Sequence, residues 1–219
     1  MIELKNINYT YHTPAGDVHA VKNVTMNFEK GKIYAITGRS GSGKTTLLSL
    51  MAGMDLTDDG EICIDGQSMK NIDRYELRKT KIGIVFQSFH LLPQLTAAEN
   101  INLVLDISKY KENAKQRTEQ LLQMVGLTAF HGKKRPLRLS GGEQQRVAIA
   151  RALASNPEII LCDEPTGNLD NENSKNIINI LISLAHEQNK CVVIITHSTQ
   201  IAEQCDEIFV MSDGNLFSK

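Results

Sequence analysis

The sequence predicts an α/β fold in which a mostly parallel sheet is interrupted by a helical insertion. Three observations support this prediction. Short apolar runs that read as strands alternate with helical patterns, an order that favours parallel strands covered by helices. A glycine-rich turn follows one of these runs, at residues 38–45. No convincing strand occurs between about Ser88 and Ser155, and strands return after that stretch.

The elements before the insertion are predicted from apolar runs and turns. The first 35 residues read as strands, because Val24, Met26 and Phe28 alternate with polar neighbours. A helix is expected after the glycine-rich turn, ending near Gly53, which can adopt the left-handed conformation of a helix end. Asp73 can cap a short helix. The remaining strands of this part are expected at residues 33–37, 61–65 and 82–86.

The stretch of residues 88–155 is expected to be the helical insertion. Thr118, Leu121 and Val125 share one helical face. Ser140 and Glu143 form a capping box that begins a helix over residues 143–154. After the insertion, strands are expected at residues 158–162, 191–196 and 207–211, with a helix at 174–187. We therefore expect one domain of residues 1–219, whose core is built from residues 1–87 and 156–219.

Composition excludes several classes of protein. The chain has 219 residues, of which 41% are hydrophobic and 22% charged, an ordinary balance for a soluble domain. Its net charge of −1 gives no general attraction to nucleic acid, so no nucleic-acid partner is expected. No signal peptide is expected, and no apolar stretch approaches the roughly 20 residues that span a bilayer. If the protein serves a membrane process, we expect a separate chain to span the bilayer.

Residues 38–45 match the pattern of a phosphate-binding loop, G-x-x-x-x-G-K-[ST], after an apolar strand and at a helix start. Glycines let backbone N–H groups surround a phosphate, with the helix dipole behind them. Lys44 is expected to bind the β- and γ-phosphates of ATP, and Thr45 to ligate Mg²⁺. The motif predicts a P-loop NTPase core. The other residues of this segment expected to contact the nucleotide are Gly38, Arg39, Ser40, Gly41, Ser42, Gly43 and Thr46.

An apolar run at residues 159–162 ends in two acids, Asp163 and Glu164. In P-loop proteins an Asp at a strand end holds Mg²⁺, which is the role expected for Asp163. Glu164 then lies at the mouth of the sheet, where it can act as a general base on the attacking water. Taken alone, such a pair reads as two solvent-facing acids. The phosphate-binding loop favours the catalytic interpretation.

A second glycine motif, LSGGEQQR, occupies residues 139–146. One interpretation is structural, since Ser140 and Glu143 form the capping box. The other is functional, because Gly141 and Gly142 leave the helix N-terminus bare, so that it can approach an anion. A chain that already binds phosphate at residues 38–45 has no obvious use for a second phosphate site. We therefore expect Ser140, Gly141, Gly142 and Glu143 to contact a nucleotide held by a second copy of the chain.

The string at residues 139–146 resembles the signature motif of ABC-type ATPases, and the resemblance covers nearly all of the chain. Within that superfamily the chain is most similar to the ATP-binding subunits of the macrolide-exporter and lipoprotein-releasing group, on residues 85–93, 95–100 and 165–170. The resemblance implies an N-terminal antiparallel β subdomain beside the P-loop core. It also implies ATP and Mg²⁺ as cofactors, an ATP-sandwich dimer, and a separate integral membrane permease at the cytoplasmic, inner face of the cell membrane.

The resemblance assigns roles to residues that the patterns alone leave open. Gln87 matches a glutamine loop that reaches Mg²⁺ and the attacking water. Asp170, together with Asn168, matches a loop that crosses to the other subunit. His197 matches a histidine that contacts the γ-phosphate.

Tyr11 matches an aromatic residue that stacks on adenine, although Tyr9 lies on the same strand face two residues away. The sequence departs from the family pattern at two positions. Glu143 stands where many relatives carry Gln, and Ser198 follows His197 where Asp is common.

Three functions follow from these resemblances. The first is a transporter motor that exports a drug, a peptide or a lipid-linked substrate through a separate permease. The second is a related motor that acts mechanically on a membrane partner without transport. The third, a soluble ATPase acting on DNA or ribosomes, is disfavoured because the chain has one ATPase unit and no long coiled coil. The sequence does not separate the first two, because substrate choice lies in the membrane chain.

Overall fold

A computed structural model describes all residues of the chain, 1–219. The strands are β1 (Ile2–Thr13), β2 (Gly16–Phe28), β3 (Ile33–Thr37), β4 (Asp59–Ile64), β5 (Gln67–Ser68), β6 (Ile82–Phe86), β7 (Ile159–Asp163), β8 (Cys191–Ile195), β9 (Glu207–Ser212) and β10 (Asn215–Ser218). The α-helices are α1 (Lys44–Met51), α2 (Arg74–Thr80), α3 (Ala97–Ile107), α4 (Ala114–Met124), α5 (Ala129–Gly132), α6 (Gly141–Ala152), α7 (Asn171–His186) and α8 (Thr199–Ala202). Two short 3₁₀ helices are η1 (Met69–Asn71) and η2 (Pro136–Arg138). No helix is both long enough and apolar enough to cross a bilayer.

The larger sheet positions the functional loops. Its strand order is β10-β9-β3-β8-β7-β6, in which all neighbours run parallel except β10, which pairs antiparallel with β9. Strands β3, β7 and β8 are apolar and almost entirely buried, as parallel strands are when both faces of the sheet are covered. Their carboxyl ends meet at one edge of the sheet. The loops at this edge carry residues 38–45, Glu164 and His197.

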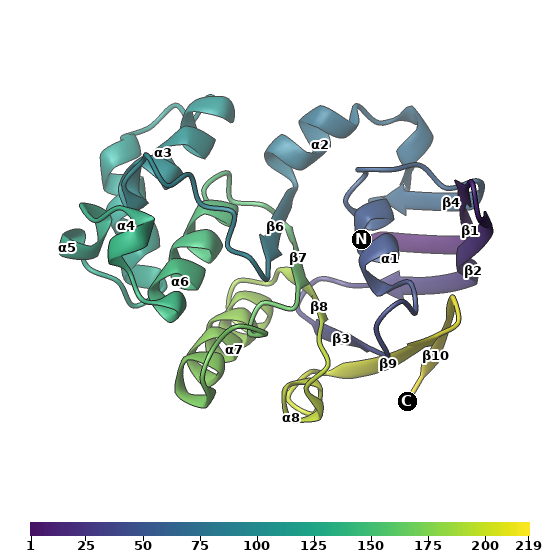
Figure 1. Cartoon of the computed structure of the whole chain (residues 1–219). Coiled ribbons are helices and arrows are strands. Elements are labelled where there is room, and N and C mark those ends of the chain that lie inside the picture. Colours follow the sequence, from purple (N-terminus) through teal and green to yellow (C-terminus); the bar gives the residue numbers. More distant parts are fainter.

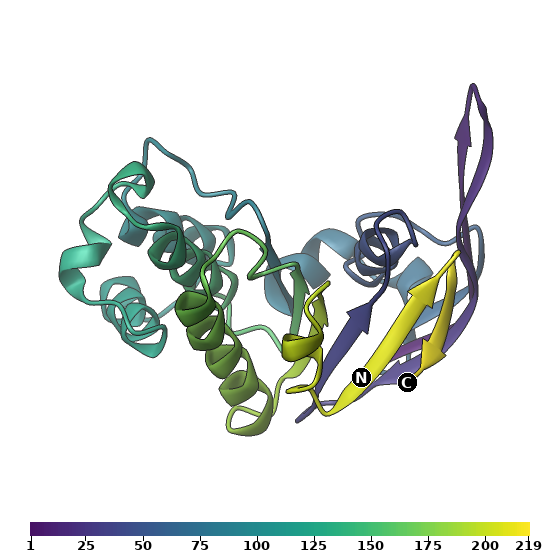
Figure 2. The ribbon, with the colours of Figure 1, turned by 60° about the horizontal axis from the view of Figure 1, so that its bottom comes forward.

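The smaller sheet is antiparallel, with the order β2-β1-β4-β5. Strands β1 and β2 continue past this sheet as a two-stranded ribbon that projects from the body of the molecule (Figure 2). The pairing of β1 with β2 shifts register between Leu4 and Thr10, where Asn6 adopts a positive φ of 51°. Such bulges increase the twist of a strand pair. The twisted ribbon brings Tyr11 to the phosphate-binding loop, as its bond to Thr46 shows.

Two hydrophobic clusters lie on the two faces of the parallel sheet. One joins α1 to both sheets, so that α1 packs between them (Figure 1). The other joins the parallel sheet to α3, α4, α6 and α7. Alternate residues of one strand divide between the clusters: Leu161 belongs to the first, and Ile160 and Cys162 to the second. This alternation is the two-residue period of a strand covered on both faces.

As predicted, only helices lie between β6 and β7. The structure differs from the sequence predictions at several element ends. For example, α7 begins at Asn171, three residues before the predicted start. The earlier start has a local cause, because the Asp170 carboxylate accepts a hydrogen bond from the Asn173 N–H at 2.8 Å. The short strands β5 and β10 were not predicted, since each forms only by pairing with the strand before it.

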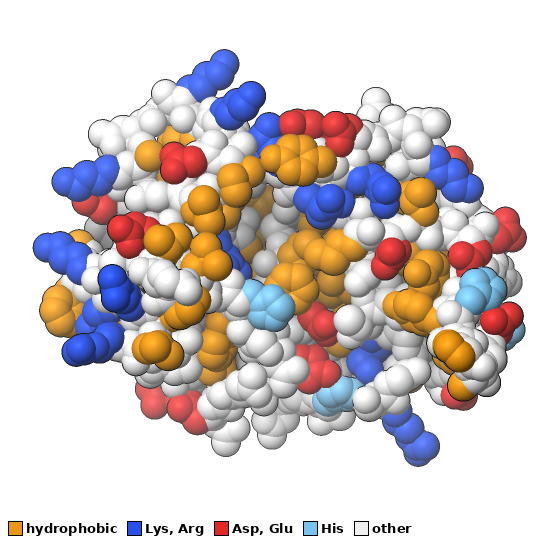
Figure 3. Space-filling model, turned by 45° about the horizontal axis from the view of Figure 1, so that its top comes forward, with side chains coloured by type: hydrophobic (Ala, Val, Ile, Leu, Met, Phe, Trp, Pro, Cys, Tyr) orange, Lys and Arg blue, Asp and Glu red, His pale blue; other side chains and the backbone are white.

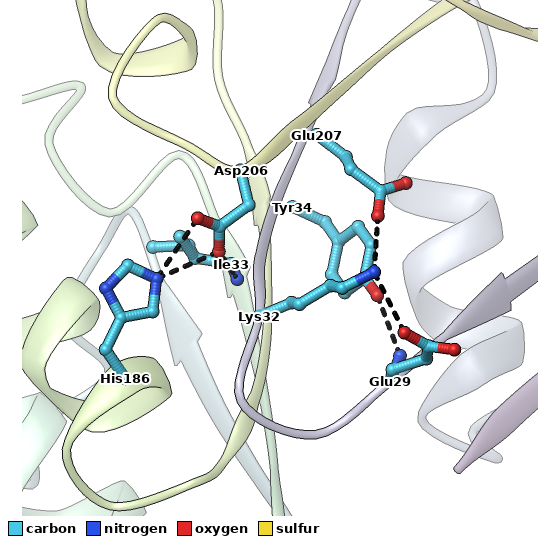
Figure 4. A network of polar contacts seen from close by, with 7 residues as sticks. All are labelled: Glu29, Lys32, Ile33, Tyr34, His186, Asp206 and Glu207. Atoms are coloured by element: carbon cyan, nitrogen blue, oxygen red, sulfur yellow. Dashed lines mark hydrogen bonds and ion pairs between the residues drawn. The ribbon is translucent and has the colours of Figure 1, made fainter.

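A polar network fixes the other end of the parallel sheet (Figure 4). The Asp206 carboxylate accepts the Ile33 N–H at 2.8 Å and lies 2.9 Å from His186 Nε2. Burial opposes ionisation of Asp206, yet the hydrogen bonds from His186 and Ile33 hold its pKa below the usual value. Beside it, Lys32 Nζ bonds to Glu207 at 3.0 Å. The network joins the starts of β3 and β9 to α7.

Candidate nucleotide-binding site

A cavity of about 640 Å³ opens at the carboxyl edge of the parallel sheet. Its walls come from the β1–β2 ribbon, the phosphate-binding loop, the ends of β7 and β8, and the turn before β10. The structure thus brings together segments that are far apart in the sequence. The predicted site residues that line this cavity are Tyr11, Ser40, Gly41, Gly43, Lys44, Thr45, Thr46, Glu164 and His197.

The phosphate-binding loop is shaped to hold an anion. The Lys44 ammonium is buried and donates to the carbonyls of Gly38, at 2.9 Å, and Arg39, at 2.8 Å. Burial lowers the pKa of Lys44, although Glu164 and Asp163 nearby oppose this shift. The Ser42 hydroxyl is also buried and has no hydrogen-bond partner. The Lys44 ammonium lines the cavity, where a buried cation fits a phosphate group.

Gly43 shows why this loop requires glycine. Its φ is 105°, in the left-handed region, and a Cβ at this position would lie 2.0 Å from the Ala20 carbonyl oxygen. The close approach packs the loop against β2. Arg39 is exposed and, like Gly38 and Ser42, does not line the cavity. Its predicted contact with the nucleotide stays a prediction.

Thr45 and Asp163 bring a hydroxyl and a carboxylate together. Thr45 Oγ1 lies 3.2 Å from Asp163 Oδ2, across from the end of β7. Burial raises the pKa of Asp163, so a cation would stabilise its ionised form. No group of three or more His, Cys, Asp or Glu side chains could hold a metal by itself. A hydroxyl and one carboxylate fit Mg²⁺, which binds through few protein ligands together with substrate phosphates.

Glu164 and His197 both line the cavity and contact each other. His197 Nε2 lies 2.6 Å from Glu164 Oε1, and the Glu164 side chain is only 23% exposed. Glu164 has a positive φ of 48°, which is uncommon for a residue with a Cβ. Its N–H donates to the Ile195 carbonyl at 3.0 Å, which holds the residue at the end of β8. A carboxylate and an imidazole in contact can receive and hold a proton from water.

Gln87 lies outside this cavity. Two hydrogen bonds join it to Asn168: the side-chain Nε2 of Gln87 donates to Asn168 Oδ1 at 3.3 Å, and Asn168 Nδ2 donates to the main-chain carbonyl of Gln87 at 3.3 Å. A Cβ on Gly167 would lie 2.7 Å from Gln87 Nε2. The structure therefore joins the loop after β6 to the loop before α7. The predicted contact of Gln87 with Mg²⁺ stays a prediction.

The motif at residues 139–146 begins α6 with the predicted capping box. Ser140 N–H donates to Glu143 Oε2 at 2.7 Å, and Glu143 N–H donates to Ser140 Oγ at 3.2 Å. The structure gives a second reason for glycine at position 142, because a Cβ there would lie 2.1 Å from Asn173 Oδ1 of α7. Packing against α7 therefore requires a glycine here, in addition to the bare helix N-terminus expected from the sequence. No residue of this motif lines the cavity.

Two further predicted residues are placed by local contacts. The Asp170 carboxylate caps α7, and hydrogen bonds from Asn173 lower its pKa. Tyr11 is 41% exposed and lines the cavity, whereas Tyr9 is partly buried and does not. Tyr9 supports the Tyr11 ring edge-on, with 5.0 Å between the ring centroids.

Several lining residues were missed by sequence reasoning. Asp17, His19 and Lys22 come from β2, and Asp213 from the turn before β10. Lys22 N–H donates to the Gly214 carbonyl at 2.8 Å, which closes this wall. These positions carry no sequence signal, because only the pairing of distant strands brings them to the cavity.

Comparison with known proteins identifies the family. A family model described as ABC transporter matches residues 21–167. This chain belongs to the ABC transporter family. Among its relatives, an uncharacterized ABC transporter ATP-binding protein of Methanocaldococcus jannaschii is 43% identical over 224 residues, covering 99% of this chain and 95% of that protein. The lipoprotein-releasing system ATP-binding protein LolD 2 of Rhodopirellula baltica is 40% identical, covering 99% and 88%.

The ABC cassette also resembles a solved structure over its whole length. A dimeric structure of a post-hydrolysis state of an ATP-binding cassette, bound to ADP and Pi, superimposes with a TM-score of 0.92 at 39% identity, covering 100% of this chain and 98% of that chain. The predicted α/β fold and the predicted family are both confirmed. The protein is an ATP-binding subunit of the ABC type, with ATP and Mg²⁺ as cofactors, and it hydrolyses ATP.

Proposed function

We propose that this ABC cassette forms an ATP-sandwich dimer with a second copy and drives a separate membrane permease. One observation supports the proposed dimer. The nucleotide cavity holds the phosphate-binding loop, Glu164 and His197 but no residue of the motif at 139–146, while Ser140 is exposed at the start of α6. A helix end built for an anion, yet remote from the nucleotide of its own chain, serves the nucleotide of another.

The residues then take the following roles in ATP hydrolysis. Lys44 holds the β- and γ-phosphates, while Thr45 and Asp163 supply oxygen ligands when Mg²⁺ is bound. Glu164 accepts the proton of the attacking water, and His197 orients Glu164 and contacts the γ-phosphate. Phosphoryl transfer depends mainly on such positioning and charge neutralisation.

The remaining predicted residues act at the edges of the site. Tyr11 stacks on adenine. Gln87 must break its hydrogen bonds with Asn168 before it can reach Mg²⁺. We therefore assign this pairing to the cassette before the second copy closes over the nucleotide. From the second copy, Ser140 and Gly142 close over the γ-phosphate, with Gly141 and Glu143 in the same turn, and Asp170 lies on the loop that crosses between copies.

Exposed apolar side chains support a protein partner. Hydrophobic side chains lie around a hollow in the face shown in Figure 3. In sequence, large exposed apolar residues occur on both sides of Gln87: Met54, Leu56 and Tyr75 precede it, and Leu92, Leu103 and Ile107 follow it. Exposed apolar surface of this kind is typical of interaction sites. We propose that the permease binds here, on the cytoplasmic face of the membrane, and exports a lipid-linked, peptide or drug substrate.

A pull-down from detergent-solubilised host membranes tests the permease. The bait is the tagged Glu164→Gln chain with ATP and Mg²⁺, and the matched control is the Lys44→Ala chain under the same conditions. We expect a stoichiometric integral membrane protein with the first bait only, and its identity narrows the substrate. Recovery of a homodimer alone, or of ribosomes or DNA, contradicts the proposal.

Protein concentration tests the dimer independently. If the motif at 139–146 acts on the nucleotide of a second copy, specific ATPase activity rises with the concentration of the purified chain. Catalytic elements supplied by a second subunit can increase the rate of nucleotide hydrolysis roughly 10³- to 10⁵-fold. A specific activity that is flat across two decades of concentration contradicts a trans site.

A further inference from the structure

His131 of the short helix α5 lies against the start of α6. Its Nε2 atom is 3.2 Å from Glu143 Oε1, and the two side chains are only 24% and 20% exposed. The opposite carboxylate oxygen, Oε2, accepts the Ser140 N–H at 2.7 Å. Glu143 therefore bridges His131 to the backbone of Ser140.

The contacts of the imidazole fix which nitrogen carries the proton. Thr128 N–H donates to His131 Nδ1 at 3.1 Å, and the Thr128 hydroxyl lies 2.9 Å from the same atom. Because Nδ1 accepts a backbone N–H, the neutral ring carries its hydrogen on Nε2. The nitrogen that carries the hydrogen is therefore the one that lies 3.2 Å from Glu143 Oε1. Glu143 is ready to accept it, because the Ser140 N–H lowers the pKa of this carboxyl and keeps it ionised.

The short helix that carries His131 is anchored on its neighbours. Gly132 is buried so closely that a Cβ there would lie 2.9 Å from Leu122 Cδ1 of α4. Two residues further, the Lys134 carbonyl accepts the Ala97 N–H of α3 at 2.8 Å. His131 thus links helices α3 and α4 to the start of α6.

We infer that His131 is a positioning residue, whose Nε2–H holds the Glu143 carboxylate against the Ser140 amide and so fixes the helix end that closes over the nucleotide of the second copy. This inference rests on the proposed dimer. It also gives a reason for Glu at position 143: a glutamine could keep one oxygen on Ser140 but would present N–H groups, not an acceptor, toward His131.

Two substitutions separate this role from a structural one. His131→Asn places an oxygen near Nδ1 and keeps an acceptor for Thr128, but removes the donor toward Glu143. His131→Gln places an amide N–H near Nε2 and keeps the donor, but loses the acceptor for Thr128. Both are made in the Glu164→Gln chain, and ATP-dependent dimerisation is measured by sedimentation with ATP and Mg²⁺.

We expect His131→Asn to weaken the ATP-bound dimer about three- to tenfold for each of the two sites, the effect of one net hydrogen bond. His131→Gln should lie close to the parent chain. The affinity of the dilute monomer for a fluorescent ATP analogue should be unchanged in both, because the phosphate-binding loop is untouched. The opposite order, with His131→Asn neutral and His131→Gln defective, overturns the inference and assigns His131 to capping α5.

A double-mutant cycle with Glu143→Gln completes the test. Residues that act through one contact are not additive. In the Glu143→Gln background, His131→Asn should therefore cause no further weakening, and full additivity overturns the inference. His186→Asn, which breaks a histidine–carboxylate pair at the other end of the sheet, is the matched control and should leave dimerisation unchanged. If the parent Glu164→Gln chain itself fails to dimerise with ATP, the proposed dimer and this inference both fail; if it dimerises and His131→Asn has no effect, only this inference fails.

Discussion

His197 Nε2 lies 2.6 Å from Glu164 Oε1, although 33 positions of chain separate the two residues. The sheet explains their meeting. Strands β7 and β8 are parallel neighbours, paired in a register that sets Asp163 opposite Ile195. The residues that follow each strand therefore emerge side by side. This register, more than either local sequence, brings the Glu164 carboxylate and the His197 imidazole together.

Glu164→Gln should stop turnover while preserving ATP binding. Glutamine can still contact His197 but cannot accept a proton from water, so kcat should fall by about 10²–10⁴-fold. Phosphate release measures the rate, and titration calorimetry the affinity. Glu187→Gln, an exposed substitution at the end of α7, is the control. Turnover retained in the first variant would remove Glu164 from the role of base.

Lys44→Ala should remove phosphate binding. The ammonium is buried and held by two loop carbonyls, and in their place a phosphate would accept charge-assisted hydrogen bonds. Loss of such bonds costs about 1.5–3 kcal/mol, which is roughly a 10- to 150-fold loss of ATP affinity by calorimetry. The exposed Lys111→Ala chain should bind ATP as the parent does. Equal affinity in both variants would contradict the assignment of the loop.

Gly142→Ala and Gly141→Ala form a matched pair for stability. A Cβ at Gly142 would lie 2.1 Å from Asn173 Oδ1, whereas at Gly141 the nearest atom is 3.5 Å away. Overpacking costs about 1–3 kcal/mol, which corresponds to a Tm lowered by about 2–10 °C in a chain of this size. Calorimetry should show that loss for Gly142→Ala and almost none for Gly141→Ala. Equal Tm values would mean that Asn173 moves away without cost.

Asp206→Asn should reduce the stability of the fold at neutral pH. It should also make that stability less dependent on pH in the acid range. The pKa of Asp206 is lowered in the folded chain, so its carboxylate stabilises the fold at pH values above the unfolded pKa, near 4. That contribution is lost as pH falls through the lower, folded pKa. Because the side chain is 35% exposed, we expect only about 1 kcal/mol at pH 7. Urea unfolding between pH 3 and pH 7 checks this, and parallel curves for both chains would contradict it.

Much of the parallel sheet could be predicted from sequence, because β3, β6, β7 and β8 are short and mostly apolar. Glu158 and Pro157 mark where β7 begins, and the run before Asp163 has no polar residue. The capping box at Ser140 was equally visible, since a cap depends on neighbours in the chain. Signals of this kind depend on neighbouring residues in the chain, so they can be recognised in a single sequence.

Other parts of the site depend on contacts between distant segments and could not be predicted. Lys22 and Asp213 carry no motif, yet strand pairing brings both to the cavity. From the sequence, Gly142 was interpreted only as part of a bare helix N-terminus. The structure shows that Asn173 occupies the position that a side chain at residue 142 would need. The pairing of Gln87 with Asn168 likewise joins two loops 81 positions apart.

The ribbon of β1 and β2 supports one wall of the cavity, and the parallel sheet supports the other. The phosphate side is held by buried residues such as Lys44 and by the fixed register of the parallel sheet. The opposite wall, with Tyr11, stands on two strands that project from the body of the molecule. If Tyr11 stacks on the nucleobase as proposed, substitutions in the ribbon should change which nucleobase is preferred and leave the proposed hydrolytic groups in place. Nucleotide preference and chemistry would then be separable traits, open to independent evolutionary change.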